Sequence, residues 1–273
     1  MDTRPIGVFD SGLGGLTAVR SLRQILPEEQ IIYFGDTARV PYGGRERETI
    51  LKYARQDVRF LRSFDLKAVV IACGTISTTS LGTLQEENDL PMVGVVEPAC
   101  RRALAVSEKK RVGVIATLAS IRSGAYETVL RRLDPEVEVF RQSCPLFVPL
   151  VENGRFRPGD IVIETVAREY LEPLRETGID TLILGCTHYP LLRSTLRQIM
   201  GEKVNLVNPA YETARELKAL LERDGLNNDG KQSYEGAMHE FYVSDAANKF
   251  KNFANSILPY GVDTTQLIHI EDY

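Results

Sequence analysis

Short apolar runs rich in β-branched residues alternate with longer segments of helical periodicity along nearly the whole chain. Eight of these runs are candidate strands: Ile6–Phe9, Gln30–Phe34, Ala68–Ala72, Met92–Val96, Val112–Ala116, Val137–Phe140, Thr181–Leu184 and Val204–Val207. Strands that alternate with helices usually join in a mostly parallel sheet with helices on its faces. The pattern therefore predicts an α/β fold.

The segment after Arg45 is the clearest predicted helix. Four apolar residues recur there at spacings of three and four, so they share one face: Leu51, Ala54, Val58 and Leu61. The charged residues Lys52, Arg55 and Asp57 fall on the opposite face. We expect the apolar face to lie in the core.

The two halves of the chain repeat one arrangement of strand ends. In the first half a strand ends at Asp10 and a later strand ends at Cys73. In the second half the corresponding residues are Thr117 and Cys186. The repeat predicts two pseudo-symmetric α/β domains whose strands point their carboxyl ends at a shared cleft, where ligands of such sheets bind.

The predicted domains are residues 1–97 plus 210–273 and residues 98–209. The chain is expected to cross between them near Glu97 and to return near Pro209. The final stretch, with an apolar run at 241–243 and a helix over 246–258, should then rejoin the first domain. The polar run between Asp224 and Ser233 is typical of an exposed loop.

Composition narrows the possible partners and compartment. The 273 residues carry a net charge of −4 and 43% hydrophobic residues, an ordinary balance for a globular protein. Because the only basic block is Lys109-Lys110-Arg111, neither nucleic acid nor a membrane surface is an expected partner. The N-terminal residues lack the pattern of a signal peptide and no apolar run is long enough to span a membrane, so a cytoplasmic protein is expected.

Cys73 and Cys186 are the residues most suggestive of chemistry. A cysteine on an apolar strand is more often a small core residue than a reactive one. Both of these, however, stand where a strand stops and polar residues begin, with Thr75 after the first and Thr187 after the second. Such surroundings can activate a thiol, so we interpret the two as a reactive pair, able to remove a proton from one side of a small substrate and return one from the other.

The remaining cysteines and the histidine beside Cys186 indicate neither a disulfide framework nor a metal site. Cys100 and Cys144 lack polar company and are interpreted as structural, and four scattered cysteines do not resemble a disulfide framework. Cys186 and His188 could begin a metal site, but the chain has no second ligand pair, so no metal is predicted.

The sequence allows more than one role for two loops and one carboxylate. The loop 10–15 could bind an anion at the start of a helix, but it does not match the glycine spacing of dinucleotide or P-loop sites, so no nucleotide cofactor is predicted. The turn 41–44 could contact a substrate, and Glu152 alone would be interpreted as a solvated loop residue.

Taken as a set, these motifs resemble the glutamate racemases of the aspartate/glutamate racemase superfamily. The resemblance extends over nearly the whole chain and rests on five segments: 7–17, 41–43, Cys73 with Thr75, 149–152 and 185–192. It implies a two-domain, cofactor-independent, homodimeric enzyme in which two cysteines interconvert D- and L-glutamate and supply D-glutamate for peptidoglycan.

The resemblance also implies roles for individual residues. Asp10 would assist Cys73, while Glu152 and His188 would assist Cys186. Further residues would line the substrate site and hold its carboxylates and ammonium group: Asp10, Ser11, Pro41, Tyr42, Gly43, Gly74, Thr75, Thr117 and Thr187.

The chain departs from the family pattern beside the first cysteine. Relatives usually have Asn and then, two positions on, a small residue, whereas this chain has Gly74 and Ile76. Two alternatives therefore stay open: a racemase of aspartate or another amino acid, and a binding or regulatory homologue without catalytic activity.

Overall fold

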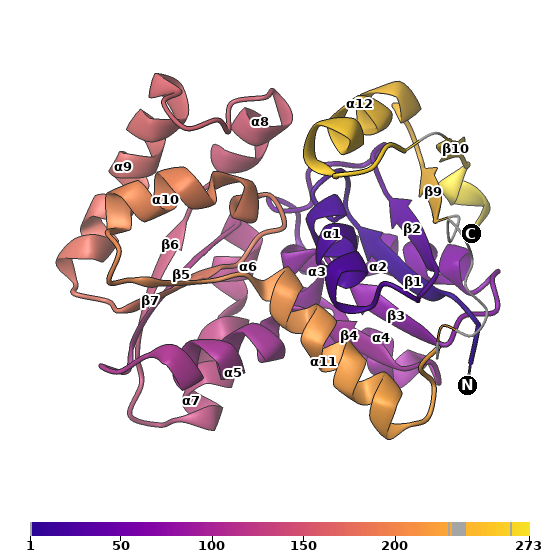
Figure 1. Ribbon diagram of the computed structural model, residues 1–273, viewed down its shortest axis with the longest axis horizontal. Coiled ribbons are helices and arrows are strands. Elements are labelled where there is room, and N and C mark those ends of the chain that lie inside the picture. Colours follow the sequence, from indigo (N-terminus) through magenta and orange to yellow (C-terminus); the bar gives the residue numbers. More distant parts are fainter. Residues whose placement is uncertain (1, 229, 231–238, 263) are drawn as a thin grey trace.

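The molecule consists of two lobes, each built on a parallel β-sheet flanked by helices (Figure 1). The computed structural model describes residues 2–228, 230, 239–262 and 264–273. The predicted α/β fold with two parallel-sheet halves is confirmed. Part of the polar run predicted between Asp224 and Ser233 lies outside the described residues.

The first lobe contains a six-stranded sheet in the order β10-β9-β2-β1-β3-β4. Its strands are β1 (Ile6–Asp10), β2 (Ile31–Gly35), β3 (Ala68–Ile71), β4 (Met92–Gly94), β9 (Glu240–Val243) and β10 (Gln266–Leu267). Its helices are α1 (Leu16–Ile25), α2 (Arg47–Leu61), α3 (Gly74–Thr79), α4 (Leu81–Glu87), α12 (Ala247–Ile257) and the 3₁₀ turn η2 (Ile270–Asp272). Every pairing in this sheet is parallel, so the end of the chain rejoins the first sheet as expected.

The second lobe contains a four-stranded parallel sheet in the order β6-β5-β7-β8. Its strands are β5 (Arg111–Ala116), β6 (Glu138–Ser143), β7 (Thr181–Leu184) and β8 (Asn205–Val207). Its helices are α5 (Val96–Val106), α6 (Leu118–Ser123), α7 (Ala125–Leu133), α8 (Phe147–Glu152), α9 (Ile161–Glu176), η1 (Tyr189–Leu192) and α10 (Arg193–Met200). Helices α9 and α10 cover one side of the sheet, and α5 and α7 cover the other (Figure 1).

The order β6-β5-β7-β8 repeats the order β2-β1-β3-β4 of the first lobe. The internal repeat inferred from strand ends is therefore a repeat of topology. Helix α11 (Pro209–Arg223) packs against α1 of the first lobe and α5 of the second (Figure 1). The domain boundaries after residues 97 and 209 stay predictions.

Strand boundaries differ from the predicted ones at two places that matter. Strand β4 ends at Gly94, because the next helix already begins at Val96. Strand β6 runs on to Ser143, three residues past the predicted end, through the polar residues Arg141 and Gln142. At this sheet edge a polar sequence is tolerated, because the side chains of β6 are only partly buried.

The prediction for Asp57 was wrong. Helix α2 buries the expected apolar face, and Asp57 is fully buried with it, because Asp57 follows Ala54 by three residues and precedes Leu61 by four and so shares their face. Its carboxylate contacts Arg39 at 3.1 Å, and the Arg39 guanidinium also contacts Asp36 at 2.5 Å. A residue of the preceding loop thus supplies the cation for this buried carboxylate.

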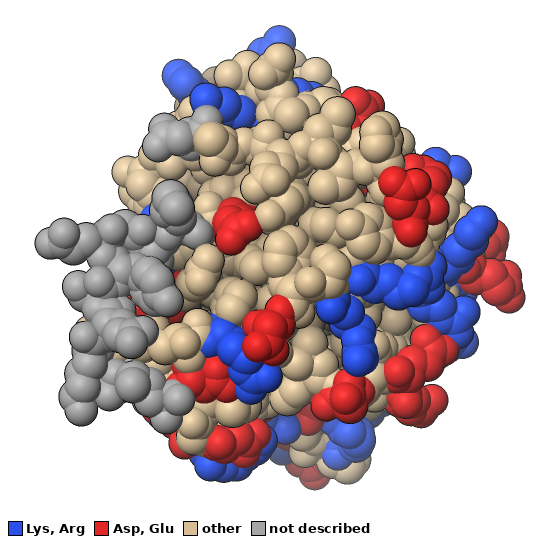
Figure 2. All heavy atoms as spheres, turned by 90° about the vertical axis from the view of Figure 1, so that its right-hand side faces the viewer, with Lys and Arg blue, Asp and Glu red and all other residues tan. Residues whose placement is uncertain are grey.

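Two surface properties bear on partners. Over the described residues, no helix is both long and apolar enough to cross a membrane. On the face drawn in Figure 2, basic and acidic side chains are interspersed, and the described residues there form no extended basic patch.

Candidate active site

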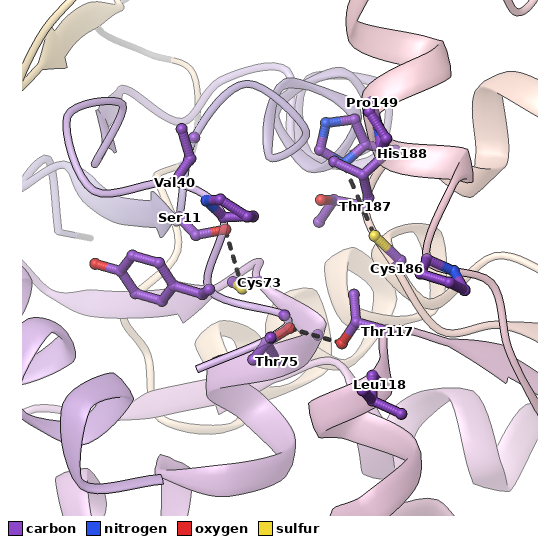
Figure 3. Close-up of a pocket in the computed structure, with 18 of the residues that line it drawn as sticks. Ser11, Val40, Cys73, Thr75, Thr117, Leu118, Pro149, Cys186, Thr187 and His188 are labelled. Carbon is purple, nitrogen blue, oxygen red and sulfur yellow. Dashed lines mark hydrogen bonds between the residues drawn. The ribbon is translucent and has the colours of Figure 1, made fainter. Parts of the chain in front are cut away.

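A cavity of about 390 Å³ lies between the lobes, at the carboxyl ends of the central strands of both sheets. Figure 3 shows Cys73 and Cys186 on opposite walls of this cavity, one from each lobe. Its lining residues are Ser11, Gly12, Val40, Pro41, Tyr42, Gly43, Gly44, Cys73, Gly74, Thr75, Thr117, Leu118, Cys144, Pro145, Val148, Pro149, Glu152, Cys186, Thr187 and His188. Of the site residues predicted from the sequence, all but Asp10 therefore line one cavity.

Cys73 is positioned by the junction between β3 and α3. The strand ends at Ile71, and Cys73 precedes the first residue of the helix, which aims its side chain past the strand end. The thiol is 5% exposed and donates to Ser11 Oγ at 3.5 Å. Burial, together with the nearby charge of Asp10, raises the pKa of Cys73 to about 12. In the free protein this sulfur is therefore a protonated thiol.

Cys186 is surrounded by different groups from those around Cys73. Its Sγ atom lies 3.8 Å from His188 Nδ1, and His188 Nε2 lies 3.2 Å from Glu152 Oε1. Burial opposes the charged form of His188, but the bonds to Cys186 and Glu152 outweigh it and raise the histidine pKa from 6.5 to about 10. An imidazolium beside Cys186 is an electrostatic partner for negative charge on that sulfur.

Glu152 also connects the two lobes. It lies at the end of α8, and its Oε2 atom is 3.3 Å from Nζ of Lys249 on α12 of the first lobe. Burial disfavours the carboxylate, yet His188 and Lys249 together lower its pKa below the usual value. The solvated loop residue suggested by local sequence is thus a largely enclosed carboxylate.

The Glu152–His188 pair predicts a pH dependence of stability. Folded His188 keeps its proton up to pH about 10, whereas an unfolded histidine loses it near 6.5. Between these values the folded state binds more protons than the unfolded state. The contribution of this pair to the free energy of unfolding is therefore fully present below pH 6.5 and is lost as the pH rises through 10. Urea unfolding of the wild type should show this loss over that window. The unfolding free energy of a His188→Asn variant should depend less on pH, whereas that of the exposed-residue control His269→Asn should follow the wild type. Equal slopes in all three proteins would contradict the prediction.

Asp10 lies behind the cavity wall and does not line the cavity. It is fully buried, its Oδ2 atom accepts from the Gly12 amide at 3.0 Å, and Thr187 Oγ1 donates to Oδ1 at 3.4 Å. Burial raises the pKa of this carboxyl. Asp10 is therefore placed to order the loop beside Cys73 and to influence the charge of that sulfur.

The predicted hydroxyl residues meet across the lobe boundary. Thr75 Oγ1 and Thr117 Oγ1 are 2.9 Å apart, although one follows β3 and the other follows β5. Tyr42 is different: it lines the cavity, but its hydroxyl donates to Asp36 and lies 3.4 Å from Asp57. The phenol oxygen of Tyr42 is therefore engaged in the buried acidic cluster, which leaves only the rest of the residue to face a ligand.

Sequence reasoning missed five residues of the cavity wall: Val40, Leu118, Cys144, Pro145 and Val148. Gly12, Gly44 and Pro149 also line the cavity, and each lies in a segment that the sequence had singled out. Cys144 was interpreted as structural because it lacked the polar surroundings of Cys73 and Cys186, and the strand before it was predicted to end at Phe140. Since β6 ends at Ser143, Cys144 stands at the carboxyl end of a strand, as Cys73 and Cys186 do. The signal that could have found it was its position relative to the true strand end.

Among the residues that the structure describes, no group of three or more His, Cys, Asp or Glu side chains is arranged to hold a metal ion. All four cysteines are free thiols. The chemistry that this arrangement offers is proton transfer by two sulfurs on facing walls.

Comparison with known proteins agrees with this arrangement. A family model for Asp/Glu/Hydantoin racemase matches residues 15–217. The glutamate racemase of Geobacter metallireducens is 46% identical over 258 residues, covering 94% of each chain. A glutamate racemase isoform from Bacillus anthracis superposes with a TM-score of 0.91 at 37% identity, covering 98% of both chains. The glutamate racemase of Francisella tularensis, solved in complex with D-glutamate, gives 0.90 at 38% identity over 100% of both.

The family model spans most of the chain, and the similar proteins match it over nearly their full length. This chain belongs to the Asp/Glu/Hydantoin racemase family of isomerases.

Proposed function

We propose that this protein interconverts D- and L-glutamate without a cofactor. The observation that carries the proposal is the pair of thiols, Cys73 and Cys186, on opposite walls of one cavity between the lobes. Racemisation needs a base on one side of the α-carbon and an acid on the other. The similarity to glutamate racemases supports glutamate as the substrate.

In the proposed reaction, the thiolate of one cysteine removes the α-proton and becomes a thiol. The electron pair of the broken C–H bond stays on the substrate as a carbanion delocalised into its carboxylate. The thiol of the other cysteine then gives its proton to the opposite face and becomes the thiolate. Each turnover therefore exchanges the protonation states of the two sulfurs, and the reverse reaction restores them.

The surroundings of the two sulfurs suit this exchange. Cys186 has the imidazolium of His188 at 3.8 Å as a partner for its thiolate, whereas Cys73 is a buried thiol. The carbanion needs fixed donors and little water. Ser11, Thr75 and Thr117 supply hydroxyl groups at the cavity wall, and burial of both thiols indicates that bulk water is largely excluded.

Incubation with each glutamate enantiomer in deuterated water tests the proposal. The protein should convert either enantiomer into the other with one α-deuterium in the product, because the returning proton comes from a thiol that has exchanged with solvent. Proton NMR with chiral analysis measures both events. Absence of α-exchange with both enantiomers would contradict the proposal and favour the homologue without catalytic activity.

The choice of substrate is a separate question, because Gly74 provides no side chain where an amide would be expected. We propose glutamate and not aspartate or another amino acid. Turnover across a panel of amino-acid enantiomers separates these outcomes. The proposal further includes supply of D-glutamate for peptidoglycan in the cytoplasm; formation of a homodimer stays a prediction that sedimentation would test.

A further inference from the structure

Three glycines of the first lobe touch the second lobe around the cavity. A Cβ atom at Gly14 would lie less than 3.0 Å from the Thr187 and His188 side chains, and one at Gly43 less than 3.0 Å from Thr117. A Cβ atom at Gly74 would come equally close to the carbonyl oxygen of Gly185. The lobes therefore meet at points where one partner has no side chain.

The contact at Gly74 differs from the other two because it meets backbone. At Gly14 an added methyl group would meet the far ends of the Thr187 and His188 side chains, which can rotate away, and at Gly43 it would meet the Cβ and methyl atoms of Thr117. Only at Gly74 would it meet a backbone carbonyl oxygen. Gly185 is moreover tied to the second sheet, since its amide donates to Ile115 O at 2.7 Å. On the facing side, Gly74 is the first residue of α3, and the Ser77 amide donates to Cys73 O at 2.9 Å. Neither side of this contact can yield locally.

The contact also lies beside both thiols. Gly74 follows Cys73 directly and Gly185 precedes Cys186 directly, and an added Cβ at position 74 would be 3.7 Å from the Cys186 Cα atom. Any separation of these two backbone segments is therefore transmitted to the two sulfurs within one residue.

From this geometry we infer that Gly74 is a positioning residue for the reaction: its missing side chain lets the two cysteine-bearing segments meet backbone to backbone and so sets the spacing across the cavity. The inference deepens the proposed function, on which its effect on turnover rests. It also gives a physical reason for glycine at a position where relatives usually carry Asn: in this chain a side chain there would hold the lobes apart.

The test compares Gly74→Ala with Gly82→Ala. Gly82 is a matched control because it also lies in a short helix of the first lobe, and a Cβ there would meet nothing within 4 Å. In Gly74→Ala, kcat/KM for racemisation should fall by roughly 10²-fold, the usual effect of displacing a reacting group by about 1 Å. The Gly82→Ala variant should match the wild type.

A second readout does not depend on racemisation. Cys73 and Cys186 are 5% and 9% exposed, so iodoacetamide should label both slowly in the wild type. Separation of the lobes should speed labelling of both in Gly74→Ala, as measured by peptide mass spectrometry, while the fully buried Cys100 stays protected. This comparison remains informative even if the wild type does not act on glutamate, so failure of the proposed function and failure of this inference are distinguishable.

The other outcomes would overturn the inference. Unchanged labelling of both thiols in Gly74→Ala would show that the lobes did not separate, whatever the turnover. Faster labelling with normal turnover would show that the spacing does not matter for the reaction. Labelling of Cys100 would show that the added methyl group unfolds the chain and does not shift its lobes.

Discussion

Replacement of Cys73 or Cys186 by serine should reduce racemisation by roughly 10²- to 10⁴-fold, the usual contribution of one general acid–base group. A hydroxyl has almost the shape of a thiol but is a much weaker acid, so it neither forms the anion at neutral pH nor donates its proton as readily. The cavity wall should stay intact in both variants, because each replacement changes one atom. Cys100→Ala is the matched control, since Cys100 is fully buried and does not line the cavity.

The two single variants should also differ in which enantiomer they still engage. Each keeps one sulfur, which can remove the α-proton only from the enantiomer that presents it to that wall, and which can return solvent deuterium to the same face. Slow α-exchange without racemisation should thus be seen with one enantiomer in Cys73→Ser and with the other in Cys186→Ser. The double variant should show neither. Turnover close to the wild type in either single variant would rule out the two-thiol mechanism.

Replacement of Arg39 by methionine should destabilise the fold by about 3–5 kcal/mol, as expected when a buried ion pair loses one partner. Arg39 is 11% exposed and faces Asp36 and Asp57, both of them fully buried. Without the guanidinium, the two buried carboxyl groups would lose the cation that they both contact. Because Val40 to Gly44 form part of the cavity wall directly after Arg39, the same variant should also weaken substrate binding.

The effect should depend on pH in a defined direction. Burial and the neighbouring Asp36 raise the pKa of Asp57 well above its ordinary value, and Arg39 opposes this shift. Removal of Arg39 raises the pKa of Asp57 further. The folded state must then take up a proton on this carboxyl group that the unfolded state does not hold at neutral pH. The loss of stability should be larger at about pH 8 than at about pH 5.

Urea denaturation at both pH values measures this difference. The control is Arg55→Met on helix α2, which also carries Asp57, because Arg55 forms an ion pair with Glu87 at an exposed site, where such pairs contribute about 1 kcal/mol or less. Equal losses in Arg39→Met and Arg55→Met would contradict a special role for the buried cluster.

Much of the fold was predictable because it is encoded in short-range patterns. A strand such as β3 or β7 is a run of mostly apolar residues buried on both faces, and the first polar residue within a few positions after it, Thr75 or Thr187, indicates where the strand ends. In a parallel sheet these ends lie at one edge, so Cys73 and Cys186 could be assigned to the same region of the molecule without coordinates. The same reasoning failed at β6, whose partly exposed residues lack that pattern, and Cys144 was misplaced with it.

Three features could be derived from the sequence alone: the order of strands and helices, the repeat between the halves and the identity of the thiols at the strand ends. The tertiary structure decided the pairing of Asp57 with Arg39, the link from Lys249 through Glu152 to His188, and the approach of Gly74 to Gly185. The physical reason is the separation of the contacting residues along the chain. Periodicity reports which face of one segment is apolar, whereas these contacts join segments far apart in the sequence. Their energies depend on which groups the closed fold brings within a few ångströms of one another.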